Sequence, residues 1–190
     1  LNPLTADSLE VKNANLTVAT KKSSNGMQLY ELIGKDYDDE MWDLMLERVT
    51  MSTMEEMINT AVFKIAGASY IGKPITLESD SPAGFNNFMN DTFQGCCAYS
   101  SQIVLGSTWS KELAKEMGLS VGNEGIFGNG ETPFSGWYAP GANIHRSPFS
   151  GRNYEYFSED PVLTGIMAAE EVSGALERGV YAYVKHLAVN

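Results

Sequence analysis

The chain has 190 residues, of which 43% are hydrophobic and 19% charged, a composition typical of a folded globular domain. Acidic residues outnumber basic ones 24 to 13, and the net charge of −11 argues against nucleic acid or an anionic membrane as a partner, because both bind clustered Lys and Arg. No apolar run approaches the roughly 18 residues of a transmembrane helix, and nothing calls for a metal or redox cofactor, since the only cysteines, Cys96 and Cys97, are adjacent and make a poor metal site.

The first part of the chain is polar. Residues 1–37 are predicted to be a lead-in or linker, and residues 38–190 the main domain. Asp38-Asp39 predicts the start of a helix with Trp42, Met45, Leu46 and Val49 on one face. Ser52, followed three residues later by Glu55, has the spacing of a capping box and predicts the start of a second helix.

Short apolar runs then alternate with helical patterns. Residues 75–77 predict a buried strand whose carboxyl end carries Asp80, and residues 103–105 predict a second strand. Ser110 is expected to cap a helix that Gly118 ends, and residues 137–139 predict a third strand.

A long polar and aromatic loop covers residues 140–158. Asp160 before a proline starts the next helix, with Val162 and Ile166 expected on its buried face. Residues 180–184 predict a strand that delivers Lys185 and His186 at its far end. Helices alternating with short strands predict a parallel α/β architecture. A complete barrel needs about 250 residues, so we expect an incomplete TIM-type (β/α)8 barrel of about four to five βα units.

Four polar residues fall at or beyond the carboxyl ends of these predicted strands, where barrels of this kind build their sites. Asp80 can accept hydrogen bonds from two hydroxyls, and Arg152, Lys185 and His186 can donate, which suits a neutral sugar. Taken singly, each has a plainer interpretation as a turn former, an ion-pair partner or an exposed strand end. Nearby aromatic residues suit stacking on sugar rings: Trp137, Tyr138, Tyr154, Tyr156 and Phe157.

Three segments carry a resemblance to a known family. Residues 139–161, which read APGANIHRSPFSGRNYEYFSEDP, resemble the signature loop of family 3 glycoside hydrolases. Lys185-His186 is similar to that family's Lys-His motif, and Asp80-Ser81-Pro82 to its Asp-Gly-Pro segment. The resemblance covers roughly residues 38–190 in the family's order and implies the N-terminal part of the catalytic barrel.

The resemblance implies a retaining, exo-acting β-glucosidase that acts on a β-glucoside or an oligosaccharide. Asp80, Arg152, Lys185 and His186 would then hold the non-reducing sugar. The sequence departs from the family pattern where Ser81 replaces the usual Gly, and at Asn86, where many members have an Arg that touches the sugar.

The resemblance also implies an aspartate nucleophile in a Ser-Asp-Trp-like context on a later strand. The 190 residues contain no such segment, so the nucleophile is expected beyond Asn190 and this chain alone is predicted to be inactive. The general acid/base is not assigned. A partial barrel leaves a strand edge unpaired, so the expected partner is the remainder of the polypeptide or a second copy.

Other functions remain open. β-Xylosidase or α-arabinofuranosidase activity uses the same kind of sugar grip, and a degenerate barrel could bind carbohydrate without catalysis. The family's β-N-acetylhexosaminidase branch is less favoured, because its Pro-Gly-containing loop is replaced here by residues 187–190, which read LAVN.

Overall fold

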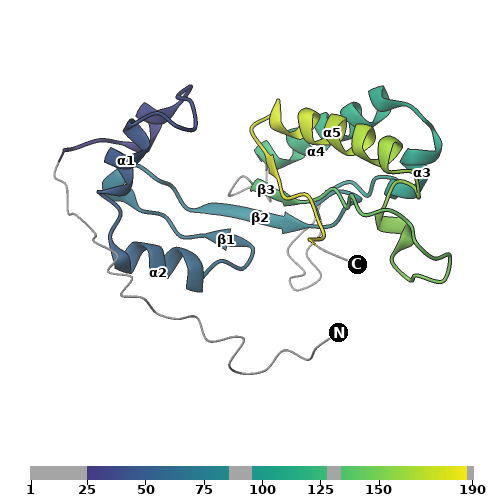
Figure 1. Cartoon of the computed structure of the whole chain (residues 1–190), viewed down its shortest axis with the longest axis horizontal. Coiled ribbons are helices and arrows are strands. Elements are labelled where there is room, and N and C mark those ends of the chain that lie inside the picture. The colour runs from purple at the N-terminus through teal and green to yellow at the C-terminus, as the bar shows by residue number, and fades with distance from the viewer. Residues whose placement is uncertain (1–24, 86–95, 128–133, 188–190) are drawn as a thin grey trace. The chain divides into compact units, whose positions relative to one another are not determined.

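The computed structural model describes residues 25–85, 96–127 and 134–187 (Figure 1). The chain divides into two compact units, one made of Leu1–Glu55 with Ala68–Lys73 and the other of Glu56–Gly67 with Pro74–Asn190. The predicted boundary at residues 37/38 stays a prediction. The elements in chain order are η2 (Leu29–Leu32), α1 (Met41–Leu46), α2 (Met51–Asn59), β1 (Lys64–Ile65), η3 (Ser69–Ile71), β2 (Thr76–Asp80), α3 (Gln102–Ser107), α4 (Lys111–Phe127), β3 (Phe134–Tyr138), η4 (Asn153–Glu155), α5 (Pro161–Leu176) and β4 (Tyr181–Ala182).

Both helices predicted in the first part of the chain are present. At the start of α1 the carboxylate of Asp39 accepts the backbone N–H of Met41 at 2.9 Å, and Met45 is buried. α2 begins one residue before the predicted capping box. Its first turn is capped by Thr50, whose hydroxyl accepts the N–H of Thr53 at 3.2 Å, rather than by the serine predicted for this role.

The sheet has four strands in the order β1-β2-β3-β4. β2, β3 and β4 are parallel, as predicted, whereas β1 is antiparallel to β2 with Lys64 opposite Leu77. The connection between β1 and β2 carries only the short η3 helix, and a parallel pair would need a longer crossover. The fold is therefore a mixed α/β architecture, and the described strands form an open sheet. The incomplete barrel stays a prediction.

The strand predicted at residues 103–105 is wrong, because this segment is the helix α3. Gln102, Leu105 and Gly106 are buried at helical spacing. A Cβ atom at Gly106 would collide with the carbonyl oxygen of Phe157, so only glycine permits this packing. A run of three apolar residues is too short to distinguish a buried strand from one helical face.

Two further predictions for the helices are corrected by their packing. α4 continues through Gly118 instead of ending there, and a Cβ at this position would collide with the carbonyl oxygen of Glu171 on α5. Gly118 is thus a point of close helix contact rather than a helix stop. On α5 the predicted inward residues Val162 and Ile166 are 68% and 48% exposed, because the face that meets α4 is lined by small residues such as Gly174.

α4 and α5 lie side by side and cover one face of the sheet, where α4 contacts β3 and α5 contacts β4 (Figure 1). Asp160 caps α5 as predicted, accepting the N–H groups of Val162 and Leu163 at 2.7 and 2.9 Å. The core between helices and sheet includes Trp137 and Met167.

Candidate functional site

The fold brings all four predicted binding residues to one end of the parallel strands. Asp80 is the last residue of β2, and Lys185 and His186 follow β4. Arg152 belongs to the loop between β3 and α5, directly before η4. Parallel strands end at the same edge of a sheet, so residues far apart in sequence meet there.

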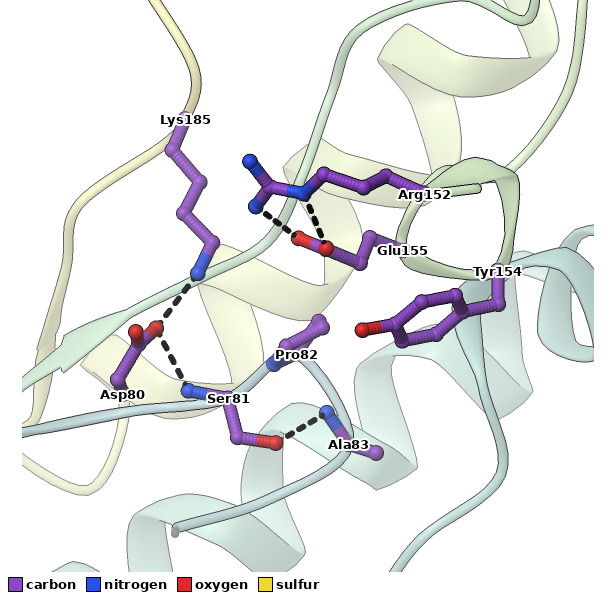
Figure 2. Close-up of a pocket in the computed structure, with 8 residues that line it drawn as sticks. All are labelled: Asp80, Ser81, Pro82, Ala83, Arg152, Tyr154, Glu155 and Lys185. Atoms are coloured by element: carbon purple, nitrogen blue, oxygen red, sulfur yellow. Dashed lines mark hydrogen bonds and ion pairs between the residues drawn. The ribbon is translucent and has the colours of Figure 1, made fainter. Parts of the chain in front are cut away.

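Asp80 and Lys185 form the first part of the site. The Lys185 Nζ atom lies 2.6 Å from Asp80 Oδ1, and the same oxygen accepts the backbone N–H of Ser81 at 2.7 Å (Figure 2). The Lys185 side chain is 16% exposed and the Asp80 side chain 28%. Among the described residues Asp80 Oδ2 has no hydrogen-bond donor, so it is open to a hydroxyl of a ligand.

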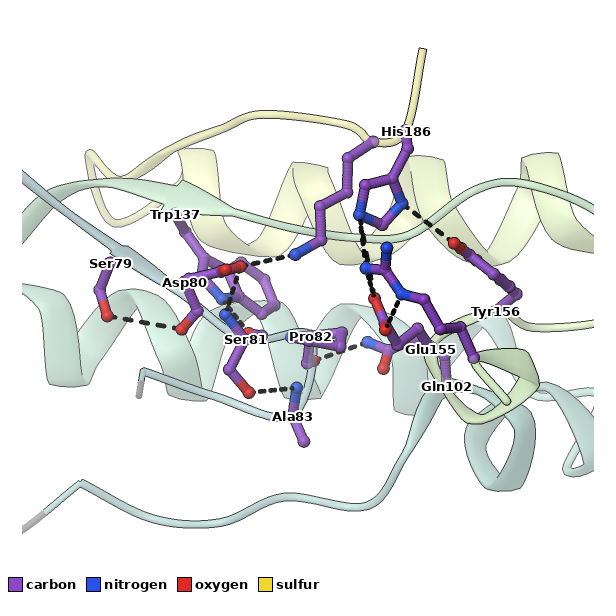
Figure 3. A network of polar contacts seen from close by, with 12 residues as sticks. Ser79, Asp80, Ser81, Pro82, Ala83, Gln102, Trp137, Glu155, Tyr156 and His186 are labelled. Carbon is purple, nitrogen blue, oxygen red and sulfur yellow. Dashed lines mark hydrogen bonds and ion pairs between the residues drawn. The ribbon is translucent and has the colours of Figure 1, made fainter. Parts of the chain in front are cut away.

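Ser81 holds the turn beside Asp80. Its φ angle is 99°, a region that favours glycine, and it occupies the position where the resemblance expects Gly. Its carbonyl accepts the indole N–H of Trp137 at 2.7 Å, and its hydroxyl accepts the N–H of Ala83 at 3.3 Å (Figure 3). These bonds maintain the strained turn that orients Asp80.

Arg152 is paired with a carboxylate. Its Nε and Nη2 atoms donate to the two oxygens of Glu155 at 2.5 and 2.7 Å (Figure 2). Burial opposes ionisation of Glu155, but the hydrogen bonds and charge of Arg152 outweigh it, so the pKa of Glu155 is lowered. The same bonds raise the pKa of Arg152. Both groups are therefore charged, and the ion-pair interpretation of Arg152 is correct without excluding a ligand.

His186 contacts Arg152 and is not itself part of the pocket lining. Its Nε2 atom is 2.8 Å from Arg152 Nη2, and its Nδ1 atom is 3.0 Å from the Tyr156 hydroxyl (Figure 3). Arg152 can only donate, so Nε2 accepts and the proton of the neutral ring is on Nδ1. Burial, followed by the charges of Arg152 and Lys185, lowers the pKa of His186.

A pocket of about 290 Å³ lies between these groups. It is lined by Asp80, Ser81, Pro82, Ala83, Arg152, Tyr154, Glu155 and Lys185 (Figure 2). Three of the four predicted binding residues thus line the pocket, and the fourth contacts one of them. The pocket combines charged donors with carboxylate acceptors, a combination that matches the hydroxyls of a small polar ligand.

Residues 40–190 match the family model described as "Glycosyl hydrolase family 3 N terminal domain". The chain belongs to glycosyl hydrolase family 3. This match agrees with the resemblance of the signature loop and of the Lys-His motif.

Known members of glycosyl hydrolase family 3 resemble this chain in sequence and structure. The chain is 36% identical to β-glucosidase A of Butyrivibrio fibrisolvens over 134 residues. These aligned residues cover 70% of this chain but only 15% of that protein. β-Glucosidase 3B from Thermotoga neapolitana, solved in complex with α-D-glucose, is 36% identical with a TM-score of 0.58 and covers 67% of this chain and 18% of that one. A β-glucosidase from Paenibacillus barengoltzii is 26% identical with a TM-score of 0.71, and the match covers 90% of this chain and 19% of that one. This chain therefore spans less than one fifth of these family 3 relatives.

Most of the aromatic residues expected to stack on a sugar serve the structure of this family 3 domain instead. Trp137, Tyr156 and Phe157 are at most 3% exposed, and Tyr138 is bonded to Glu78. Tyr154 alone among the five lines the pocket, with 55% of its surface exposed. Asn86, the other departure from the family 3 pattern, lies outside the described residues.

A buried carboxylate two residues before Asp80 was not predicted from the sequence. Glu78 is 4% exposed and accepts hydrogen bonds from Tyr138, Tyr183 and Tyr181 at 2.5, 2.7 and 3.0 Å. Burial and Glu78 raise the pKa of Tyr138 and Tyr183, so both stay protonated donors. Gly136 faces this cluster, and a Cβ there would crowd Glu78. The alternation of Tyr181 and Tyr183 was the available signal, because residues two apart on a strand share one face.

A second buried acid is linked to the pocket lining through Gln102. Glu171 on α5 is fully buried and accepts from Gln102 Nε2 at 3.1 Å. The same amide donates to the carbonyl of Pro82 at 2.7 Å (Figure 3). Burial raises the pKa of Glu171 to about 8, although the bond from Gln102 acts in the opposite direction. Both residues are fully buried, so neither is available to a ligand.

The described residues contain no group of His, Cys, Asp or Glu side chains placed to hold a metal ion. In the same parts of the chain, no helix is both long and apolar enough to span a membrane.

Proposed function

We propose that this chain is the sugar-binding part of the catalytic barrel of a retaining, exo-acting β-glucosidase. The observation that carries the proposal is the meeting of Asp80, Lys185 and Arg152 at one pocket, although Asp80 and Lys185 are 105 residues apart in sequence. The β-glucosidase names of the family 3 relatives support the choice of substrate.

In this proposal the non-reducing glucosyl residue occupies the pocket beside Asp80. The open carboxylate oxygen of Asp80 accepts a hydroxyl proton, while Lys185 and Arg152 donate to hydroxyl oxygens. His186 acts in the same grip through its contact with Arg152. Tyr154 supplies an aromatic face at the rim.

The two carboxyl groups of a retaining glycosidase lie about 5–5.5 Å apart, and one of them forms a covalent bond to the sugar. Asp80 and Glu155 are both held in ion pairs, with Lys185 and Arg152, which does not suit either carboxylate to the role of nucleophile. We therefore propose that the nucleophile and the acid/base lie outside residues 1–190. The outer edge of β4 would pair with another strand, from the remainder of the polypeptide or from a second copy.

A slow 2-fluoro aryl β-glucoside tests this assignment, because it traps the glycosyl-enzyme of a retaining enzyme. The natural polypeptide that contains residues 1–190 would be treated with it and the label located by peptide mass spectrometry. We expect the label on an aspartate outside residues 1–190. A label on Asp80 would show that Asp80 is the nucleophile, and glucose binding without any label would favour a non-catalytic carbohydrate-binding protein.

A further inference from the structure

Glu155 has no role in the proposed sugar grip, yet it is the most enclosed charged group at the pocket. Its side chain is 6% exposed, whereas the Arg152 side chain that it binds is 48% exposed. The carboxylate uses both oxygens on one guanidinium, in the bidentate geometry that fixes an arginine in direction as well as in distance.

The backbone around Glu155 is also fixed. A Cβ at Gly141 would crowd the Glu155 carbonyl oxygen at 2.6 Å, so the loop after β3 packs directly against η4. Gly141 bridges to Tyr156 on one side and to Lys185 on the other. The carboxylate is thus attached to the same backbone framework that positions Lys185.

The contacts of Arg152 define what Glu155 does. Nε and Nη2 of Arg152 face Glu155, Nη2 also reaches His186, and Nη1 has no partner among the described residues. The His186 Nε2 atom is 3.9 Å from the Glu155 carboxylate. An exposed arginine without this support would lose rotamer freedom on binding a sugar, whereas one already held in place would not.

We propose that Glu155 is a positioning residue that fixes the Arg152 guanidinium so that Nη1 meets one hydroxyl of the bound sugar. The inference rests on the proposed sugar-binding function of this pocket and adds a residue to it. Glu155 itself does not exchange a proton with the substrate, because a carboxylate held by two charge-assisted hydrogen bonds is a poor acid at neutral pH.

The test compares the dissociation constants of glucose and of its 2-, 3-, 4- and 6-deoxy analogues, measured by calorimetry on the natural polypeptide. In the unsubstituted protein, loss of the hydroxyl that Arg152 binds should weaken affinity about tenfold. Arg152→Met should abolish the penalty at that position only. Glu155→Gln should abolish the same penalty, and the double variant should bind no more weakly than Arg152→Met, because both substitutions remove one interaction.

Glu177→Gln is the matched control, because Glu177 also pairs with a cation at 2.5 Å, in Lys115, but does not line the pocket. It should leave every dissociation constant unchanged. If Glu155→Gln weakens the binding of all five sugars equally, and additively with Arg152→Met, the positioning role is overturned. That result is expected of a substitution that destabilises the whole pocket. Glu155→Asp, which keeps the charge on a shorter side chain, serves if Glu155→Gln does not fold, with the same selective loss expected.

The binding measurements distinguish a failure of the proposed function from a failure of the role of Glu155. If the unsubstituted polypeptide binds no glucose, both the proposed function and the role of Glu155 are overturned. If it binds glucose and Glu155→Gln binds all five sugars as the unsubstituted protein does, only the role of Glu155 is overturned.

Discussion

The backbone N–H of Ser81 donates to the carboxylate of Asp80 at 2.7 Å from a residue whose φ angle is 99°. The hydrogen bond that orients the acid therefore depends on a conformation that a side chain disfavours. Residues in such regions carry backbone strain of order 1–3 kcal/mol. Substitution of Ser81 can therefore change the stability of the protein through this strain.

Ser81→Gly should stabilise the protein by about 1 kcal/mol, because the relief of backbone strain exceeds the added entropy of the unfolded chain. Ser81→Ala is the matched variant, since it keeps the strain and loses only the hydroxyl bond to Ala83. Urea denaturation at equilibrium measures both. A Ser81→Gly protein less stable than Ser81→Ala would contradict the strain argument.

Lys185→Met should weaken glucose binding about tenfold or more, because a charge-assisted donor is lost and Asp80 is left without its cation. Calorimetry with glucose on the natural polypeptide measures the change. Lys115→Met is the control, since Lys115 pairs with Glu177 outside the pocket and should leave binding unchanged. Equal affinities for the two variants would remove Lys185 from the sugar grip.

His186 should titrate below the usual pH range of histidine and carry its proton on Nδ1. Protonation would place a cation against Arg152 and Lys185, with Glu155 and Asp80 only partly compensating. Because the pKa is lower in the folded state, this group's contribution to stability is present above the ordinary pKa and is lost as pH falls below it. Nitrogen-15 NMR of the two histidines, with His145→Gln to assign them, measures both properties. A proton on Nε2 would contradict the acceptor role assigned here.

Glu171 should make stability fall as pH rises. Its pKa is about 8 in the folded state against an ordinary value of 4.5, so the unfolded chain releases its proton first. Between these two values the folded state binds more protons, and each pH unit lowers stability by at most about 1.4 kcal/mol. Glu171→Gln should flatten this slope and be the more stable protein at pH 8, as judged by urea denaturation from pH 5 to 8. A slope unchanged by the substitution would contradict the burial argument.

Gly118→Ala should destabilise the protein by about 1–3 kcal/mol, because the added methyl group collides with the Glu171 carbonyl between α4 and α5. Gly165→Ala on α5 is the opposite case, since nothing lies within 4 Å of its Cβ position. It should gain about 1 kcal/mol from helix propensity. Thermal melts of the two variants should shift in opposite directions, and shifts of the same sign would refute the contact.

These glycines show where prediction from sequence ends. Gly118 at the end of a helical pattern indicates a helix stop, and only the position of α5 shows that it is a contact. The same holds for residues 103–105, which belong to the helix α3 that packs closely against Phe157 through Gly106. By contrast, the meeting of Asp80 and Lys185 was predictable, because polar residues that follow parallel strands lie at the same edge of the sheet. Glu78 and Glu155 were missed because a buried carboxylate is recognised by its partners, which belong to other strands and turns.

The ionised side chains that line the pocket cancel in sign. Asp80 and Glu155 are matched by Lys185 and Arg152, and the chain around them has a net charge of −11. The long-range field of this chain thus repels anions while the pocket itself attracts neither sign. Uronic acids and sugar phosphates would be slowed on approach, most strongly at low ionic strength, whereas uncharged sugars would enter at a rate indifferent to salt.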